Sequence, residues 1–280
     1  MPELPEVETI RAYLQAFLPG RQVMAVRHLD PRMVKMGLWD STMIGAYLPG
    51  LVVQSMERRG KYLLIRFPEQ AWLAVHLGMS GRLVIANRDQ AWKNHTHMVL
   101  EIAGGEEMRL IDPRRFGRLG MFKAERPEDF LQLGPEPLGR HFTSSYLSYR
   151  LQKRSTAIKS LLLDQALLAG LGNIYVDEAL FKARIHPLTP GQDLPVDAVA
   201  RLVRAIRLVL REGIRHRGTS FSDYVDALGH PGENQDYLSV YGRFGQPCVR
   251  CGNPIQRIVI HQRTSHFCQR CQLPLEPWED

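Results

Sequence analysis

Hydrophobic residues recur at helical spacing at the start of the chain and then in short runs. Val7, Ile10, Leu14 and Phe17 keep the helical spacing until Pro19-Gly20 ends it, which predicts a first helix. From residue 22 to residue 123, β-type runs are separated by Gly, Asp and Asn. The predicted strands are Gln22–Leu29, Leu51–Arg58, Lys61–Phe67, Trp72–His76, Leu83–Ala86, His97–Ile102, Glu107–Ile111 and Leu119–Lys123. Many short strands with few helical segments indicate a β-sandwich.

Helical spacing returns after a proline-containing stretch. Residues 124–142, which include Gly134-Pro135-Glu136-Pro137, are predicted to link two domains. The helices predicted beyond this linker are Thr143–Lys153, Thr156–Leu163, Ile174–Arg184 and Val196–Ile214. A chain of 280 residues is long enough for two domains. The patterns therefore predict an α+β, two-domain chain, with an N-terminal β-sandwich flanked by helices and a helical C-terminal part.

The charge balance indicates a polyanionic partner. Lys and Arg outnumber Asp and Glu by 36 to 29, a formal net charge of +7, which leaves DNA, RNA and an anionic membrane open. No acidic residue occurs from Tyr237 to Leu275, and such a one-sided stretch favours nucleic-acid phosphates. The arginines within it are Arg243, Arg250, Arg257, Arg263 and Arg270. We find no secretory signal and no apolar run that could span a bilayer, so we expect a cytoplasmic, nucleoid-associated bacterial protein with no membrane partner.

All four cysteines lie near the end of the chain, in two Cys-x-x-Cys pairs. Sixteen residues separate the pair Cys248 and Cys251 from the pair Cys268 and Cys271. This spacing is typical of a ribbon in which four thiolates surround one zinc ion, and a full set of protein ligands makes the metal structural rather than catalytic. The alternative, two disulfides, is disfavoured in a cytosolic chain. We therefore expect one structural Zn²⁺.

The first six residues, Met1-Pro2-Glu3-Leu4-Pro5-Glu6, allow two interpretations. If Met1 is removed, Pro2 becomes a free secondary amine, and an α-amino group has an ordinary pKa of about 7.7–8.0, against about 10.4 for Lys. Such an amine can attack an aldehyde-like sugar carbon and form an iminium ion, with Glu3 and Glu6 as neighbouring carboxylates. Alternatively, the prolines and glutamates merely begin the helix. Both interpretations can hold together, because a helix that begins here would fix the terminus in place.

Three loops carry further candidate residues. Lys61 is predicted at the tip of a hairpin, where a solvated turn lysine is the commoner case. Met79 lies in a glycine-rich loop, which packing into a core explains poorly. Arg114, Arg115 and Phe116 share a third loop, which fits either contacts to phosphates and bases or a turn with a buried Phe.

Together these segments resemble the formamidopyrimidine-DNA glycosylases, which share a fold with the endonuclease VIII-type glycosylases. The matching segments are Pro2–Thr9, Arg59–Leu63, His76–Gly81, Asp112–Gly117, Leu133–Leu138, Gly170–Tyr175 and the four-cysteine ribbon. They span almost the whole chain in the family's order. The resemblance implies a catalytic β-sandwich domain over 1–132, a helical helix–two-turn–helix domain over 133–235 and a β-hairpin zinc finger over 236–280, with DNA held between domains.

The resemblance also implies a chemistry. The enzyme would excise oxidised purines, typically 8-oxoguanine and formamidopyrimidines, from duplex DNA and then cut the strand at the abasic site by β,δ-elimination. Pro2 would attack C1′ of the damaged nucleotide, and Glu3 would act as acid and base on the opening sugar. Glu6 would help position the site, and Lys61 would contact the phosphate beside the lesion.

The DNA contacts are implied in the same way. A glycosylase flips its target nucleotide out of the duplex, and wedge side chains enter the vacated space. By resemblance these wedge residues are Met79, Arg114 and Phe116. The other DNA-binding residues implied are His95, Arg115, Asn173 and Arg263.

Two positions depart from the family pattern, and two other functions stay open. In the family, a basic residue is common at the positions of Ser222 and Ser155. Ser222 belongs to the loop that closes over the flipped base in the family, so these two serines make the lesion preference harder to infer.

The alternative functions are an endonuclease VIII-type enzyme that prefers oxidised pyrimidines and a non-catalytic zinc-ribbon DNA-binding protein. The Met79 loop favours the purine branch, and retention of both Pro2 and Glu3 argues against a non-catalytic protein. We expect a monomer that binds double-stranded DNA containing oxidised bases or abasic sites.

Overall fold

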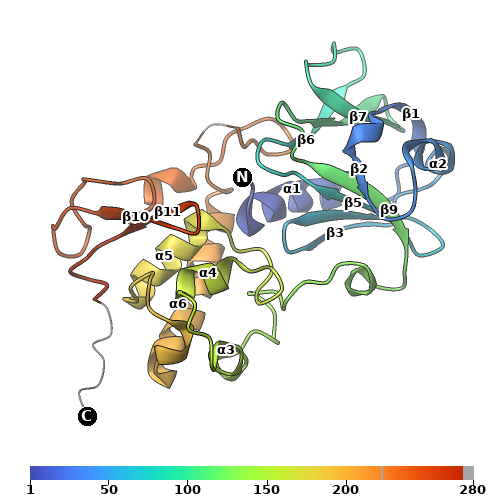
Figure 1. Cartoon of the computed structure of the whole chain (residues 1–280). Coiled ribbons are helices and arrows are strands. Elements are labelled where there is room, and N and C mark those ends of the chain that lie inside the picture. The colour runs from blue at the N-terminus through green and yellow to red at the C-terminus, as the bar shows by residue number, and fades with distance from the viewer. Residues whose placement is uncertain (222, 274–280) are drawn as a thin grey trace. The chain divides into compact units, whose positions relative to one another are not determined.

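The computed structural model describes residues 1–221 and 223–273, which pack as two units. The sandwich unit comprises Met1–Gln132 and Gly213–Gln235 (Figure 1). The helical unit comprises the rest of the described chain. Within the described residues, no helix has both the length and the apolar character that a bilayer crossing needs.

Two sheets form the sandwich unit. Their strands are β1 (Val23–Leu29), β2 (Val34–Met36), β3 (Ser55–Arg59), β4 (Tyr62–Arg66), β5 (Ala71–His76), β6 (Arg82–Asn87), β7 (Thr96–Ile102), β8 (Glu106–Ile111) and β9 (Arg118–Lys123). One sheet has the order β1-β7-β8-β6 and the other the order β2-β9-β5-β4-β3. Neighbouring strands are antiparallel except for the parallel pair β2 and β9. The predicted β-sandwich is therefore confirmed.

Helix α1 (Leu4–Phe17) packs its apolar stripe into the core of the sandwich unit. Val7, Ile10 and Leu14 are fully buried there, as the helical spacing predicted. A second helix, α2 (Ser41–Tyr47), contributes the buried Ile44 to the same core. The start of α1 is thus fixed by hydrophobic burial along the rest of the helix.

The segment 213–235 belongs to the sandwich unit by packing, although the predicted helical domain extended to residue 235. Tyr224 and Ala227 are buried in the sandwich core, and the carbonyl of Ala227 accepts a hydrogen bond from the N–H of Ile85 at 3.0 Å. These contacts are long-range, so the local pattern of the sequence does not contain them.

The helical unit contains the predicted helices with small shifts at their ends. They are α3 (Ser144–Leu151), α4 (Ile158–Leu163), α5 (Asn173–Ala183) and α6 (Val196–Arg215), the last of which runs into the sandwich unit. A hairpin of β10 (Gln256–Ile260) and β11 (Arg263–Phe267) follows. The turn residues His261 and Gln262 have φ of +43° and +64°, as a two-residue hairpin turn requires. This hairpin confirms the predicted finger fold.

Candidate active site

The amino terminus is held by the start of α1. Pro2 and Glu3 are buried, and the helix begins directly after them. Glu3 is the N-cap, and its backbone N–H donates to Oε2 of Glu6 at 2.8 Å in a capping box. Met1 is 41% exposed, so it is accessible to removal. The helix-start interpretation is therefore correct, and it places Pro2 and Glu3 as a terminal nucleophile requires.

Glu6 connects the terminus to the segment 213–235. Its Oε1 accepts a hydrogen bond from the N–H of Thr219 at 2.7 Å, while Oε2 accepts from Glu3. Gly218 has φ of +83°, and a Cβ there would lie 2.9 Å from Cγ of Glu6. Tyr224 donates its hydroxyl to the Glu6 carbonyl at 3.3 Å, and burial raises the pKa of this phenol. Glu6 therefore positions the surrounding backbone through both carboxylate oxygens.

Lys61 lies in the two-residue turn between β3 and β4. Gly60 in this turn has φ of +56°. Lys61 is only 7% exposed, so the alternative of a solvated turn lysine is wrong. Arg58 donates to the Gly60 carbonyl at 3.0 Å and to Oε2 of Glu8 at 2.8 Å. Because Glu8 belongs to α1, this ion pair ties the Lys61 turn to the helix that carries Pro2.

His76 holds the start of the Met79 loop (residues 77–81). Its Nδ1 accepts a hydrogen bond from the N–H of Gly78 at 3.1 Å, which requires this nitrogen to be unprotonated. Burial, together with the positive charges of Arg118 and Lys61, lowers the pKa of His76 to about 4. The neutral imidazole is therefore the form that supports the loop near neutral pH.

The neutral form of His76 should make stability depend on pH. Between pH 6.5 and pH 4 the unfolded chain binds a proton that the folded His76 excludes, so the free energy of unfolding falls as the pH drops through this window. The fall attributable to His76 is about 3 kcal/mol at most, and its contribution is constant above pH 6.5. Urea unfolding of the wild type and His76→Gln at several pH values measures it. The variant should show a shallower fall, and equal slopes would contradict this assignment.

Asp112 joins the Met79 loop to the Phe116 loop (residues 112–117). Its buried carboxylate accepts from Oγ of Ser80 at 2.5 Å and from the N–H of Gly117 at 2.7 Å. One side chain therefore closes the Phe116 loop and holds the Met79 loop against it. Such fully hydrogen-bonded buried carboxylates fix local geometry strongly, because each lost partner would leave a desolvated acceptor.

The two loops present the predicted wedge residues together. Met79 is 41% exposed and Phe116 is 52% exposed, so the alternative of a buried Phe is wrong. The guanidinium carbon of Arg114 lies 4.7 Å from the centroid of the Phe116 ring. An exposed thioether and an exposed ring beside a cation suit insertion into a gap between bases.

The contact between these loops predicts a large penalty for Gly78→Ala. Gly78 has φ of +64°, and a Cβ there would lie 2.4 Å from the carbonyl carbon of Phe116. Gly105, with φ of +91° and nothing within 4 Å of its Cβ position, is a matched control. We expect Gly105→Ala to cost about 1–2 kcal/mol from its backbone conformation alone. Gly78→Ala should cost clearly more, because the loops must separate; urea unfolding that gave equal costs would refute the close contact.

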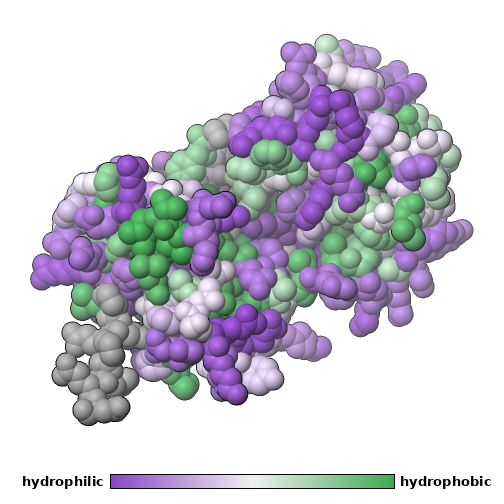
Figure 2. Space-filling view, viewed as in Figure 1, coloured by the Kyte–Doolittle hydropathy of each residue, from purple (hydrophilic) through white to green (hydrophobic). Residues whose placement is uncertain are grey.

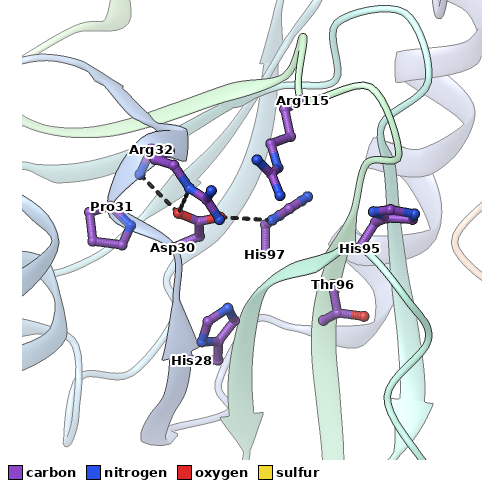
Figure 3. Close-up of a pocket in the computed structure, with 8 residues that line it drawn as sticks. All are labelled: His28, Asp30, Pro31, Arg32, His95, Thr96, His97 and Arg115. Carbon is purple, nitrogen blue, oxygen red and sulfur yellow. Dashed lines mark hydrogen bonds and ion pairs between the residues drawn. The ribbon is translucent and has the colours of Figure 1, made fainter.

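His95 and Arg115 line one hollow of about 620 Å³ on the sandwich unit (Figure 3). His28, Asp30 and Arg32 lie on its other side. The structure thus brings together two of the predicted DNA-binding residues. Guanidinium and imidazole groups around an open hollow can bind a phosphate.

Asn173 and Arg263 are brought together in the helical unit. Asn173 begins α5, and its Nδ2 donates to the carbonyl of Thr264, the residue after Arg263, at 2.8 Å. Nζ of Lys159 donates to the same carbonyl at 3.0 Å and lies 2.7 Å from Oδ1 of Asp177. Lys159 and Asp177 are both fully buried, so this ion pair holds the hairpin firmly against α4 and α5.

Two buried acids of α5 anchor the finger, and we did not predict them from the sequence. Asp177 accepts from Oγ of Ser265 at 3.0 Å and from the N–H of His266 at 2.8 Å. Glu178 accepts from the N–H groups of Val240 and Tyr241 at 2.8 and 2.9 Å. The available signal was the occurrence of adjacent acids within an otherwise apolar helix.

The four cysteines form a site for one metal ion. Their Sγ atoms all lie within 4.8 Å of one another. The pairs Cys248–Cys271 and Cys251–Cys268 are 3.9 and 3.5 Å apart, and none of the four is in a disulfide. Tetrahedral zinc with Zn–S bonds of about 2.3 Å separates its sulfur ligands by about 3.8 Å. The donor set and its spacing fit one structural zinc ion with no open coordination position.

The surface of the finger is less uniformly cationic than its composition suggested. Figure 2 shows apolar surface over the β10–β11 hairpin, where Val259 is 74% exposed. Arg257 is stacked over the Phe244 ring, 4.3 Å from its centroid. The described surface of the finger therefore combines apolar and cationic residues.

Comparisons with known proteins identify the family. Three family models match: the formamidopyrimidine-DNA glycosylase N-terminal domain over 1–119, the H2TH domain of the same glycosylases over 133–225, and a zinc finger found in FPG and IleRS over 245–273. The fold and the site thus define a DNA glycosylase with a helix–two-turn–helix region and a zinc finger. The chain belongs to the formamidopyrimidine-DNA glycosylase family.

Individual relatives are similar to this chain over nearly the full length of both proteins. The chain is 45% identical to formamidopyrimidine-DNA glycosylase of Herpetosiphon aurantiacus over 97% of this chain and 100% of the relative. It is 42% identical to the Latilactobacillus sakei protein of the same name over 98% of each. A solved Lactococcus lactis Fpg in complex with DNA containing an abasic site superposes with a TM-score of 0.91 at 35% identity, covering 97% of this chain and 99% of that one.

The two departures from the family pattern have different outcomes. Ser155 is exposed in the connection between α3 and α4. Ser222 lies outside the described residues. The effect of either serine on lesion preference stays a prediction.

Proposed function

We propose that the chain is a bifunctional DNA glycosylase and AP lyase that excises oxidised purines from duplex DNA and cuts the strand at the resulting abasic site. The observation that carries this proposal is the buried Pro2-Glu3 start of α1, to which Glu8 and Arg58 tie the Lys61 turn. Family membership supports it. So do solved Lactococcus lactis Fpg structures with DNA that contains Fapy-dG or an abasic site.

The proposed chemistry begins at the terminal amine. After removal of Met1, the nitrogen of Pro2 attacks C1′, and the bond from C1′ to the base breaks as the base leaves with a proton. Glu3 then protonates the ring oxygen as the sugar opens, which leaves an iminium ion between Pro2 and C1′. The iminium acidifies C2′; water takes up the C2′ proton as the C3′–O bond breaks and the 3′ phosphate leaves. In the second elimination, water takes up the C4′ proton as the C5′–O bond breaks and the 5′ phosphate leaves.

The remaining site residues have supporting roles in this proposal. Glu6 positions the backbone, because its carboxylate oxygens are engaged by the N–H groups of Glu3 and Thr219. The proposed phosphate contacts are Lys61, His95, Arg115, Asn173 and Arg263. Met79, Arg114 and Phe116 would fill the space left by the flipped nucleotide, and the contact between their loops supports this role.

Oxidised pyrimidines are a second substrate class with a specific observation behind them. A solved structure that is 35% identical to this chain is described as wild-type Lactococcus lactis Fpg with DNA containing an oxidised pyrimidine. Lesion preference therefore has to be measured with both classes side by side.

The experiment is single-turnover excision from duplexes that differ only in the lesion. We expect faster release of 8-oxoguanine and formamidopyrimidine than of thymine glycol. Faster release of thymine glycol would support the endonuclease VIII-type alternative. Tight binding without excision of any lesion would support the non-catalytic alternative.

We also propose three domains, 1–132, 133–235 and 236–280; the family models, which match 1–119, 133–225 and 245–273, support this order of domains, although 213–235 packs in the sandwich unit. We further propose that the protein acts as a monomer on the nucleoid in the bacterial cytoplasm. The bacterial relatives that share its family support this location.

A further inference from the structure

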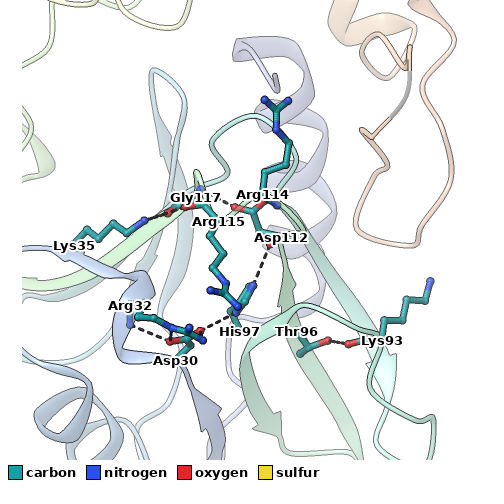
Figure 4. Close-up of polar contacts among 10 residues, drawn as sticks. All are labelled: Asp30, Arg32, Lys35, Lys93, Thr96, His97, Asp112, Arg114, Arg115 and Gly117. Carbon is teal, nitrogen blue, oxygen red and sulfur yellow. Dashed lines mark hydrogen bonds and ion pairs between the residues drawn. The ribbon is translucent and has the colours of Figure 1, made fainter.

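His97 is a buried residue in the lining of the hollow that Arg115 and His95 also line, and it lies between two oxygen atoms (Figure 4). Its Nδ1 is 3.0 Å from Oδ2 of Asp30. Its Nε2 is 3.0 Å from the backbone carbonyl oxygen of Asp112. Each ring nitrogen therefore faces a separate hydrogen-bond acceptor.

Neither of these oxygens can donate a proton. A backbone carbonyl has none to donate. Asp30 accepts from the backbone N–H, Nε and Nη2 of Arg32 at 3.0, 2.9 and 2.8 Å. The hydrogen bonds from the Arg32 side chain, the largest cause, hold the pKa of Asp30 well below its usual range, so this carboxyl is ionised.

A neutral imidazole cannot satisfy this arrangement. It carries one N–H, so one ring nitrogen of this buried side chain would face an oxygen with its lone pair. That nitrogen would itself be a buried acceptor that faces no donor, because Asp30 and the Asp112 carbonyl both accept; a buried acceptor without a donor costs about 1–3 kcal/mol. An imidazolium carries two N–H groups and satisfies both oxygens.

We propose that His97 is held as a doubly protonated imidazolium and acts as a positioning residue that fastens the Phe116 loop to the Asp30 turn. The carbonyl of Asp112 that His97 binds also accepts from the N–H of Arg115 at 3.2 Å. The carboxylate of the same Asp112 closes the Phe116 loop and holds Ser80. His97 thus fixes the position of Asp112, and the carboxylate of Asp112 holds both the Met79 loop and the Phe116 loop.

The charge on His97 also changes the character of the hollow. The charged and titratable groups that line it with His97 are His28 on β1, Asp30 and Arg32 in the turn after β1, His95 before β7, and Arg115 in the Phe116 loop. Since Arg32 and Asp30 neutralise each other, His97 and Arg115 leave an excess of positive charge. This charge favours a DNA phosphate at the hollow, a point that rests on the proposed function.

The first test reads the protonation state directly and does not depend on the proposed function. In full-length, zinc-loaded protein with ¹⁵N-labelled histidine, long-range ¹H–¹⁵N correlation spectra at pH 7.5 should show protons on both ring nitrogens of His97. The spectrum of His97→Gln assigns the signals by their loss. A pattern with a single N–H for His97 would overturn the proposal.

Asp30→Asn provides the matched variant. The asparagine amide can donate to Nδ1, so His97 should become neutral while its Nε2–H still donates to Asp112. The Nδ1 proton should therefore disappear and the Nε2 proton remain. Persistence of both protons in Asp30→Asn would overturn the role of Asp30.

The second test measures positioning through binding of a duplex that contains a stable abasic-site analogue. His97→Gln should weaken binding by about tenfold, the equivalent of one or two net hydrogen bonds, and Asp30→Asn by less than threefold because the contact to Asp112 survives. Equal binding by His97→Gln and wild type would overturn the positioning role, even with both N–H signals present. Absence of excision by the wild type would instead count against the proposed function alone.

Discussion

Glu3→Gln is expected to slow base excision and strand cutting by roughly 10²–10⁴-fold under single-turnover conditions, the usual contribution of a general acid or base. Glutamine keeps the size of the side chain and an acceptor oxygen for the N-cap, but it cannot transfer a proton. Glu3 is buried at the start of α1, so solvent cannot readily replace it. Affinity for abasic-analogue DNA should therefore stay within a few-fold of the wild type.

Two further variants separate this effect from loss of charge or structure. Glu125→Gln removes the same charge from an exposed position and should leave the rate unchanged. Glu6→Gln turns an amide N–H₂ toward a backbone N–H of Glu3 or Thr219, so it should lower stability and affinity together with the rate. A Glu3→Gln rate within tenfold of the wild type would remove Glu3 from the proposed acid–base role.

Loss of the metal is expected to reduce DNA affinity by roughly 10²-fold or more while the sandwich unit stays folded. Structural zinc typically contributes about 10–16 kcal/mol of binding free energy to a finger fold. Without it, the clustered thiols no longer hold together the two ends of the segment 248–271, which contains the β10–β11 hairpin, and Asn173 loses its hydrogen-bond partner Thr264, the residue after Arg263. The core of the sandwich unit contains none of the finger residues that the structure describes, so its β-sheet signal should persist.

Metal-free protein can be prepared by chelation, and Cys268→Ser removes one metal ligand. Circular dichroism then measures whether the sandwich unit stays folded, and a DNA titration measures the loss of affinity. Arg263→Ala is the control, because it removes one proposed phosphate contact and leaves the metal in place. Its binding should weaken moderately, with the salt slope reduced by about 1. Full DNA affinity in metal-free protein would show that the finger has no part in binding.

Local patterns in the sequence were sufficient to predict most of the longer helices and strands and the metal site. Helix α1 and the β-runs follow from hydrophobic spacing, and the Cys248–Cys271 spacing defines the metal ligands. Short elements were missed: β2 has three residues, and α2 depends on capping by Asp40, whose Oδ1 accepts from Met43 at 2.8 Å. Such elements carry too few residues for a periodic signal.

The arrangement of the candidate site depends on contacts between distant segments, which no local pattern contains. Burial of Lys61 is set by packing around its turn, so the sequence favoured the wrong solvated alternative. The hydrogen bond from Thr219 to Glu6 joins residues more than two hundred positions apart. The contact of His97 with Asp30 likewise depends on β1 and β7 being neighbours in one sheet.

In the proposed mechanism, the amine of Pro2 forms the covalent bond to the damaged nucleotide. Borohydride trapping on an 8-oxoguanine duplex, followed by peptide mapping of the adduct, tests it most directly. We expect an adduct on Pro2 in properly processed protein and none in protein that retains Met1. An adduct on Lys61 or another lysine, or efficient trapping with Met1 retained, would contradict it.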